Sequence, residues 1–320
     1  MRVSFTPIAG AFLLTLLLWA ATSGTAQAQT TMTAGDYQIY NAKGEAVSLA
    51  DVIDAMGAAD AVFVGELHND ALAHAVELEL LQGAFTRYGG ESVEKGKRRP
   101  VALSLEMFER DVQMVLDEYL AGLVQERHFL RASRPWDNYQ TDYRPLVEFA
   151  RTHKLPVLAA NAPERYVNRV SRLGRDALKE LSGQARSGWL APLPYGDASA
   201  PYAEKFRGVM GGMPAAAMQN SPHGALHLLD AQTLRDATMG HSIAEYLGRQ
   251  PGALVINVNG NFHSEGRLGA PEHLLAYRPR ARVLVVSVAG AEAPEKVDIE
   301  ALKKLGDFVV YKKRTANRTF

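Results

Sequence analysis

Short apolar runs alternate with longer stretches of helical periodicity through most of the chain. The clearest run is Ala61–Val64, which is rich in β-branched and aromatic residues, is too short for a helix and is followed by Gly65. From Asp70 to Tyr88 the apolar residues recur every three to four positions, which indicates a helix. The run, the glycine and the periodic stretch predict a buried strand, a turn and a helix, the basic unit of an α/β protein.

The same unit is repeated further along the chain. Helices are predicted at about Asp111–Ala121 and Tyr143–His153, joined by a loop. The apolar runs that we interpret as further buried strands are Val101–Leu105, Leu155–Ala159, a stretch from Leu254, and Val283–Val288. The prediction is completed by a strand at Tyr37–Tyr40, a helix from Ser48 to Met56 and an edge strand at Phe308–Tyr311. Because strand and helix alternate, we expect an α/β fold with a mainly parallel central sheet flanked by helices.

No strand pattern interrupts the chain between about residues 164 and 248. Apolar positions from Val167 to Leu181 predict one amphipathic helix, the stretch Tyr195–Pro222 has no regular pattern, and His227–Leu247 is again periodic. We interpret this segment as a helical insertion over the carboxyl ends of the strands, either a lid or a surface for a partner.

Polar side chains follow the ends of four predicted strands. They are Glu66 and His68, Glu106, Asn161, and Asn261 with His263. In open α/β sheets, ligands bind in the crevice beyond the carboxyl ends of the strands, so these side chains are expected to share one polar site. Asp236 would join them if the helix at His227–Leu247 turns that face towards the strand ends.

A glycine-x-x-histidine turn occurs twice, at an offset of 195 residues. The first copy is Gly65 to His68, and the second is Gly260 to His263. Each follows an apolar run, so the two turns would bring two imidazoles to the same edge of one sheet. The similarity also suggests an internal duplication.

The first 28 residues have the pattern of a secretory signal peptide. Arg2 precedes an uncharged apolar core from Ile8 to Ala21, and small residues lead to a cleavage site expected after Ala28. The apolar core is too short for a convincing membrane span. We therefore expect residues 29–320 to form one exported domain, periplasmic or secreted, that is soluble after cleavage and has no stable membrane insertion.

Composition narrows the chemistry that this domain can perform. The chain has no cysteine, which excludes a lipid anchor on cysteine, disulfides, a thiolate nucleophile and thiolate-ligated haem. Its 35 basic and 35 acidic residues cancel, so nucleic acid is not an expected partner.

Several motifs together resemble a known family. In chain order they are VFVGELHND, LSLEMFERDVQ, RPWDNYQTDYRPLVEFAR, VLAANAPERYVNRV, AQTLRDATM and VNGNFH. From about Ala61 to His263 the chain is similar to the ChaN-like haem-binding uptake domain of the Tiki superfamily. The resemblance implies a Tiki-type α/β fold, haem as a ligand, and a homodimer that encloses two stacked haems with tyrosine on the iron. The chain departs from the lipoprotein form of that family, because it has no cysteine to lipidate.

The residues offer several haem contacts. Ferric haem without a thiolate needs a histidine, methionine or tyrosine on the iron, an apolar slot, and cations for the propionates. Tyr143 and Tyr166 are the leading ligand candidates, because each lies on or just before a predicted helix beside a polar strand end. Arg134 could bind a propionate, and Trp136 could stack on the porphyrin. The sequence thus favours an exported haem-binding protein for haem or iron uptake or trafficking.

Two other interpretations remain open. The resemblance extends to erythromycin esterases and metal-dependent proteases, which implies a hydrolase that uses the Glu-x-His turn and the late histidine. In that case Glu66, His68, Glu106 and His263 would ligate a metal ion or, without metal, leave His68 as a general base. The third interpretation is a polar network that only supports the architecture, since buried polar groups pair regardless of function.

Overall fold

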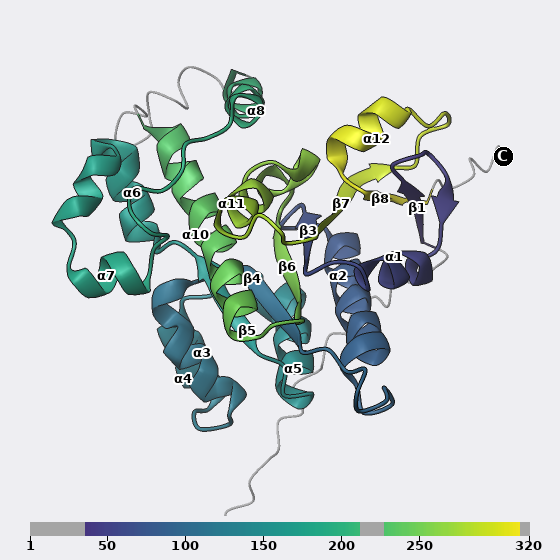
Figure 1. Cartoon of the computed structure of the whole chain (residues 1–320), viewed down its shortest axis with the longest axis horizontal. Helices are drawn as coiled ribbons and strands as arrows, with labels where there is room; N and C mark the ends of the chain where they lie inside the picture. Colours follow the sequence, from purple (N-terminus) through teal and green to yellow (C-terminus); the bar gives the residue numbers. More distant parts are fainter. Residues whose placement is uncertain (1–35, 212–226, 314–320) are drawn as a thin grey trace, which may run out of the picture. The chain divides into compact units, whose positions relative to one another are not determined.

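One sheet of eight strands runs through the part of the chain that the computed structural model describes, residues 36–211 and 227–313 (Figure 1). The strand order is β2-β1-β8-β7-β3-β6-β4-β5. The strands are β1 (Tyr37–Asn41), β2 (Ala46–Val47), β3 (Ala61–Glu66), β4 (Val101–Glu109), β5 (Val157–Asn161), β6 (Leu254–Gly260), β7 (Val283–Glu292) and β8 (Phe308–Lys312). The expected signal peptide, residues 1–28, and its boundary at residue 29 lie outside the described residues.

The sheet is mainly parallel, as predicted. Strands β5, β4, β6, β3, β7 and β8 pair in parallel, whereas β1 pairs antiparallel with both β8 and β2. The prediction of β8 as an edge strand is wrong, because β8 lies between β7 and β1. Strand β1, from the other end of the chain, pairs with the free edge of β8, and the local sequence of β8 does not reveal this pairing.

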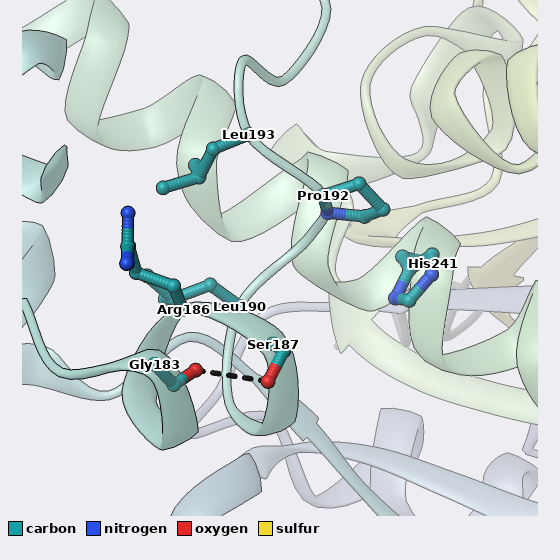
Figure 2. Close-up of a pocket in the computed structure, with 7 residues that line it drawn as sticks. All are labelled: Gly183, Arg186, Ser187, Leu190, Pro192, Leu193 and His241. Carbon is teal, nitrogen blue, oxygen red and sulfur yellow. Dashed lines mark hydrogen bonds between the residues drawn. The ribbon is translucent and has the colours of Figure 1, made fainter.

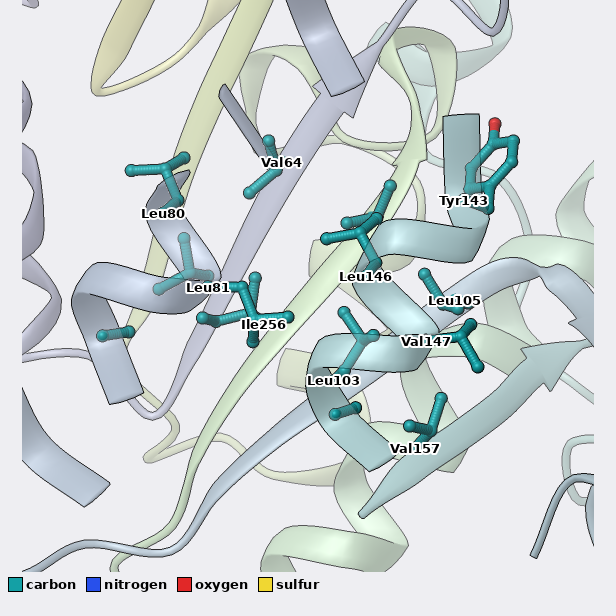
Figure 3. Packing of buried hydrophobic residues seen from close by; sticks show 14 of the residues in the cluster. Val64, Leu80, Leu81, Leu103, Leu105, Tyr143, Leu146, Val147, Val157 and Ile256 are labelled. Carbon is teal, nitrogen blue, oxygen red and sulfur yellow. The ribbon is translucent and has the colours of Figure 1, made fainter. Parts of the chain in front are cut away.

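Helices cover both faces of the sheet, and successive side chains of β3 point to opposite faces. Val62 and Val64 pack with α1 (Leu49–Met56), α2 (Ala71–Ala84) and α5 (Arg144–Thr152), and Figure 3 shows Val64, Leu80, Leu81 and Leu146 among the residues of this cluster. Ala61 and Phe63 pack on the other face with α10 (Leu228–Arg249) and α11 (Ala270–Tyr277). Because successive strand side chains point to opposite faces, a strand covered on both sides is apolar throughout.

The remaining helices lie around these layers. They are α3 (Gln113–Leu120), α4 (Glu126–Ser133), α6 (Glu164–Leu173), α7 (Gly183–Gly188), α8 (Ala200–Gly211) and α12 (Ile299–Leu305). Short π-helical or 3-10 turns are η1 (Phe85–Gly89), η2 (Arg110–Val112), η3 (Tyr139–Tyr143), η4 (Arg175–Glu180), η5 (Asn261–His263) and η6 (Glu265–Arg267). Over the described residues no helix is long and apolar enough to cross a membrane.

Three local predictions need correction. The helix expected from Val167 to Leu181 stops at Leu173, because Gly174 has a φ of 79° that ends it, and the 3-10 turn η4 follows. The loop expected after α3 contains α4, and the stretch Tyr195–Pro222, expected to be irregular, contains α8, although residues 212–222 lie outside the described part. Strand β4 continues to Glu109, so Glu106 lies inside the strand rather than at its end.

Helix α10 links the sheet face to the strand ends. Its second half packs on the sheet through Met239, Ile243 and Leu247. Its first half carries Asp236 to the ring of His263, which follows the end of β6. The predicted helical segment therefore supplies both a cover for the sheet and a side chain at its carboxyl edge.

Candidate functional site

The two glycine-x-x-histidine turns lie side by side at the carboxyl edge of the sheet. Strands β3 and β6 pair in parallel, and Glu66 is opposite Gly260. Gly65 leaves room for the turn from Gly260 to His263, because a Cβ at position 65 would collide with the side chain of Asn261. The strand register thus places His68 and His263 at one edge, as the sequence predicted.

Glu66 is the centre of the first cluster of polar side chains. Its Oε1 atom accepts hydrogen bonds from Nδ1 of His68, at 2.7 Å, and from the hydroxyl of Tyr143. Burial alone would raise the pKa of Glu66, but these bonds and the nearby His74 outweigh it and lower the pKa. The hydrogen bond to Glu66 in turn raises the pKa of His68, whose side chain is 45% exposed.

Two buried residues of α2 extend this cluster. Nδ1 of His74 lies 3.1 Å from Oε2 of Glu77 and 3.2 Å from Oε2 of Glu66. Neither residue was predicted from the sequence as part of the site. The signal was available, because His74 and Glu77 are one helical turn apart on a face otherwise made of residues such as Leu81.

His263 is the centre of the second cluster. Its ring lies 2.6 Å from Oδ1 of Asp236 and 3.2 Å from Oε1 of Glu106. Glu106 also accepts a hydrogen bond from the backbone N–H of Gly260, and Asp236 accepts one from the hydroxyl of Tyr202. The role of Tyr202, which supports Asp236 from α8, was not predicted from the sequence.

The second cluster is strongly charged although it is buried. Burial lowers the pKa of His263, but Glu106 and Asp236 outweigh that effect and raise it to about 10. Burial raises the pKa of Glu106, but His263 outweighs that effect and lowers it to about 2. The imidazole is therefore charged and held between two carboxylates near neutral pH.

A cleft of about 440 Å³ opens beside both clusters, and we call it the edge cleft. It is lined by Glu106, Met107, Glu109, Arg134, Trp136, Asn161, Glu164, Gln232, Arg235 and His263. The ring of Trp136 lies edge-on to that of His68, with 4.6 Å between ring centroids. Of the residues that the sequence predicted for the site, Glu106, Arg134, Trp136, Asn161 and His263 line the edge cleft.

Three predicted residues lie elsewhere or are already engaged. Tyr143 is 1% exposed and donates its hydroxyl to Glu66. Tyr166 is half-buried on α6, where it stacks on Trp189 at 6.4 Å. The amide of Asn261 donates to the backbone carbonyl of Val288 at 2.8 Å, so it supports the neighbouring strand β7.

A second cavity, of about 620 Å³, lies between α7 and α10 (Figure 2). Arg186, Leu193 and His241 are among its lining residues, and none of the two clusters' residues is. This cavity is therefore separate from both clusters.

The arrangement of the first cluster can serve two kinds of chemistry. Because Nδ1 of His68 is held by Glu66, its Nε2 atom presents a lone pair when the ring is neutral. Such a nitrogen can bind a metal ion or take a proton from a nucleophile.

Comparisons with known proteins bear on this choice. A family model described as haem-binding uptake, Tiki superfamily, ChaN matches residues 52–274. No curated protein matches the sequence. A structure of ChaN from Campylobacter jejuni, described with cofacial haem binding, is 15% identical, with a TM-score of 0.60 over 87% of this chain and 98% of that chain. At this identity the likeness shows a shared fold.

A mutant of the erythromycin esterase EreC in its open conformation is also similar. It is 10% identical, with a TM-score of 0.48 over 90% of this chain and 100% of that chain. That similarity is too low to support an argument about chemistry.

Proposed function

Because this chain belongs to the haem-binding uptake family of the Tiki superfamily, we propose that it binds haem at the edge cleft and serves haem or iron uptake or trafficking after export. The observation that carries the proposal is the imidazole of His68, half-exposed beside the edge cleft and fixed by a buried carboxylate. Histidines that ligate metals usually donate their other ring N–H to such a partner. Haem iron bound at this place would supply the ligand-binding and redox chemistry of haem.

His68 would fit the requirements of an iron ligand better than the tyrosines do. Its side chain is accessible, and among the described residues Nε2 makes no hydrogen bond, whereas Nδ1 bonds to Glu66. Tyr143 would have to leave its buried bond with Glu66 to reach an iron atom. Tyr166 is more exposed but packs against Arg165 and Trp189. We keep both tyrosines as alternative ligands, since the family resemblance favours tyrosine.

The rim of the edge cleft offers contacts for the rest of the haem molecule. Arg134 forms ion pairs with Glu109 at 2.6 Å and Asp111 at 2.7 Å, and its side chain is 47% exposed. Exposed ion pairs contribute little to stability, so Arg134 can exchange a carboxylate for a propionate at small cost. Arg235 lines the same cleft, and Trp136 presents an aromatic surface to the porphyrin.

We also propose the assembly that the family resemblance implies, a dimer of this chain around two stacked haems. The described cofacial binding in the C. jejuni protein supports this arrangement. In that case haem and protein should bind in equal numbers, and haem should convert monomers into dimers.

Titration of the haem-free protein with hemin tests the proposal. We expect a saturable Soret shift, with one hemin per chain and dimerisation visible by analytical ultracentrifugation. The variants His68→Ala, Tyr143→Phe and Tyr166→Phe identify the ligand, because loss of the ligand changes the ferric spectrum. His128→Ala, which removes an exposed histidine on α4, is the matched control. Absence of a saturable shift in the parent protein would refute haem binding.

One observation favours hydrolysis as a second candidate function. Two imidazole–carboxylate pairs, Glu66 with His68 and Asp236 with His263, flank the edge cleft. With Glu66 fixing its tautomer, His68 could take a proton from water, an effect worth roughly 100-fold to 10,000-fold in rate. Hydrolysis of a panel of nitrophenyl esters, with His68→Asn and with a chelator, tests this function. A rate unaffected by His68→Asn would exclude His68 as the base.

A further inference from the structure

Three buried side chains form a donor set that neither proposed function uses in full. We propose that Glu66, His74 and Glu77 bind a divalent first-row metal ion such as Zn²⁺ or Mn²⁺. One possible ligand atom from each residue lies within 4.8 Å of the other two, and all three residues are buried. The site adjoins His68, because Glu66 holds that imidazole through Oε1 and faces His74 through Oε2.

Two buried carboxylate oxygens of the cluster favour a cation. Within the described residues, Oε1 of Glu77 has no hydrogen-bond partner, and Oε2 of Glu66 has none beyond its ion-pair contact with Nδ1 of His74 at 3.2 Å. Glu66 is 2% exposed and Glu77 is 0% exposed, so water cannot freely solvate them. Buried carboxylate oxygens without partners are costly, and a cation between them would compensate both.

The orientation of His74 matches that of a metal ligand. Its Nε2 atom lies 3.0 Å from the backbone carbonyl oxygen of His68, to which the N–H donates. This hydrogen bond leaves Nδ1 facing Oε2 of Glu77, at 3.1 Å, and Oε2 of Glu66, at 3.2 Å. A histidine that donates one ring N–H to a backbone carbonyl and turns the other nitrogen to carboxylates has the usual geometry of a ligand.

The donor set selects the class of metal. One imidazole nitrogen and two carboxylate oxygens suit zinc, manganese or ferrous iron better than calcium or magnesium, which prefer oxygen alone. Three protein ligands also leave room in the coordination sphere for water. This set contains one histidine, whereas a metal bound by His68 and His263 would have two imidazole ligands, so the two sites can be distinguished.

Calorimetric titration of the haem-free protein with ZnCl₂, after treatment with EDTA, tests the site. We expect one Zn²⁺ per chain in the parent protein and at least about 100-fold weaker binding in Glu77→Gln and His74→Gln, because even residues around metal ligands cost 10–100-fold. Glu79→Gln is the matched control on the same helix. Its carboxylate accepts a hydrogen bond from Tyr37, so zinc binding should not change.

Two results would overturn the proposal. One is a parent protein without stoichiometric zinc binding, and the other is binding that both substitutions leave intact. If either variant fails to fold, X-ray absorption spectroscopy of the zinc-loaded parent decides. One imidazole among nitrogen and oxygen ligands supports the site, and two imidazoles refute it. None of these measurements uses haem, so failure of haem binding would not affect them.

Discussion

Gly260 lies directly against the imidazole of His68. A Cβ atom at position 260 would be 2.8 Å from Cε1 and 2.9 Å from Nε2 of that ring. The ring is also held on its other side, since Nδ1 bonds to Glu66. The glycine of the second turn therefore leaves the space that the histidine of the first turn occupies.

Substitution of this glycine should displace the histidine. In Gly260→Ala the ring of His68 must rotate away from Glu66, so we expect its pKa to fall towards 6.5 and the fold to lose about 1–3 kcal/mol. Titration of the ring protons by NMR and urea unfolding measure the two effects. Gly183→Ala is the control, because a Cβ there meets nothing within 4 Å. An unchanged His68 titration in Gly260→Ala would contradict close packing of Gly260 against the imidazole.

The pair of Glu106 and His263 should make stability depend on pH. The pKa of Glu106 falls from 4.5 to about 2 in the folded protein. Its contribution to the free energy of unfolding is therefore present above pH 4.5 and is lost as the pH falls towards 2. The pKa of His263 rises from 6.5 to about 10. Its contribution to the free energy of unfolding is therefore present below pH 6.5 and is lost as the pH rises towards 10.

The parent protein should therefore exceed Glu106→Gln in stability most strongly between pH 4.5 and 6.5. The expected difference there is of the order of a few kcal/mol, because both groups are buried. Urea unfolding of both proteins across the pH range gives this difference directly. A difference independent of pH would show that the two groups do not titrate as a pair.

Asp236→Asn should weaken the charge on His263. The imidazole would keep Glu106 but lose one of its two carboxylates, so its pKa should fall while staying above 6.5. We expect a loss of about 3 kcal/mol in unfolding free energy, typical of a broken buried ion pair. Asp230→Asn is the control on the same helix, because its pair with Arg175 is partly exposed and should be worth about 1 kcal/mol or less. Equal losses in the two variants would contradict this assignment.

Tyr143→Phe separates a supporting role from iron ligation. The hydroxyl of Tyr143 donates to the buried Glu66, so its removal should cost about 1.5–3 kcal/mol of unfolding free energy. If His68 binds the iron, the ferric haem spectrum of this variant should match that of the parent protein. Loss of a phenolate-to-iron absorption band would instead identify Tyr143 as the ligand.

Much of the fold follows from local patterns in the sequence. An apolar run such as Ala61–Val64 indicates that both faces of a strand are covered. Helical periodicity indicates that one face of a helix is covered. Parallel strands also end at the same edge, so residues that follow them converge. For these reasons the mainly parallel sheet and the place of His68 and His263 at one edge of it could be predicted, whereas the family was indicated by a resemblance of motifs.

The tertiary structure decided which side chains pair and which way they face. His74, Glu77 and Tyr202 join the two clusters from helices, and their place depends on how those helices dock on the sheet. The same docking turns Tyr143 towards Glu66 and Tyr166 towards Trp189. Local periodicity gives the face of a helix that is buried, but the partner against that face comes from a distant part of the chain, and only packing fixes it.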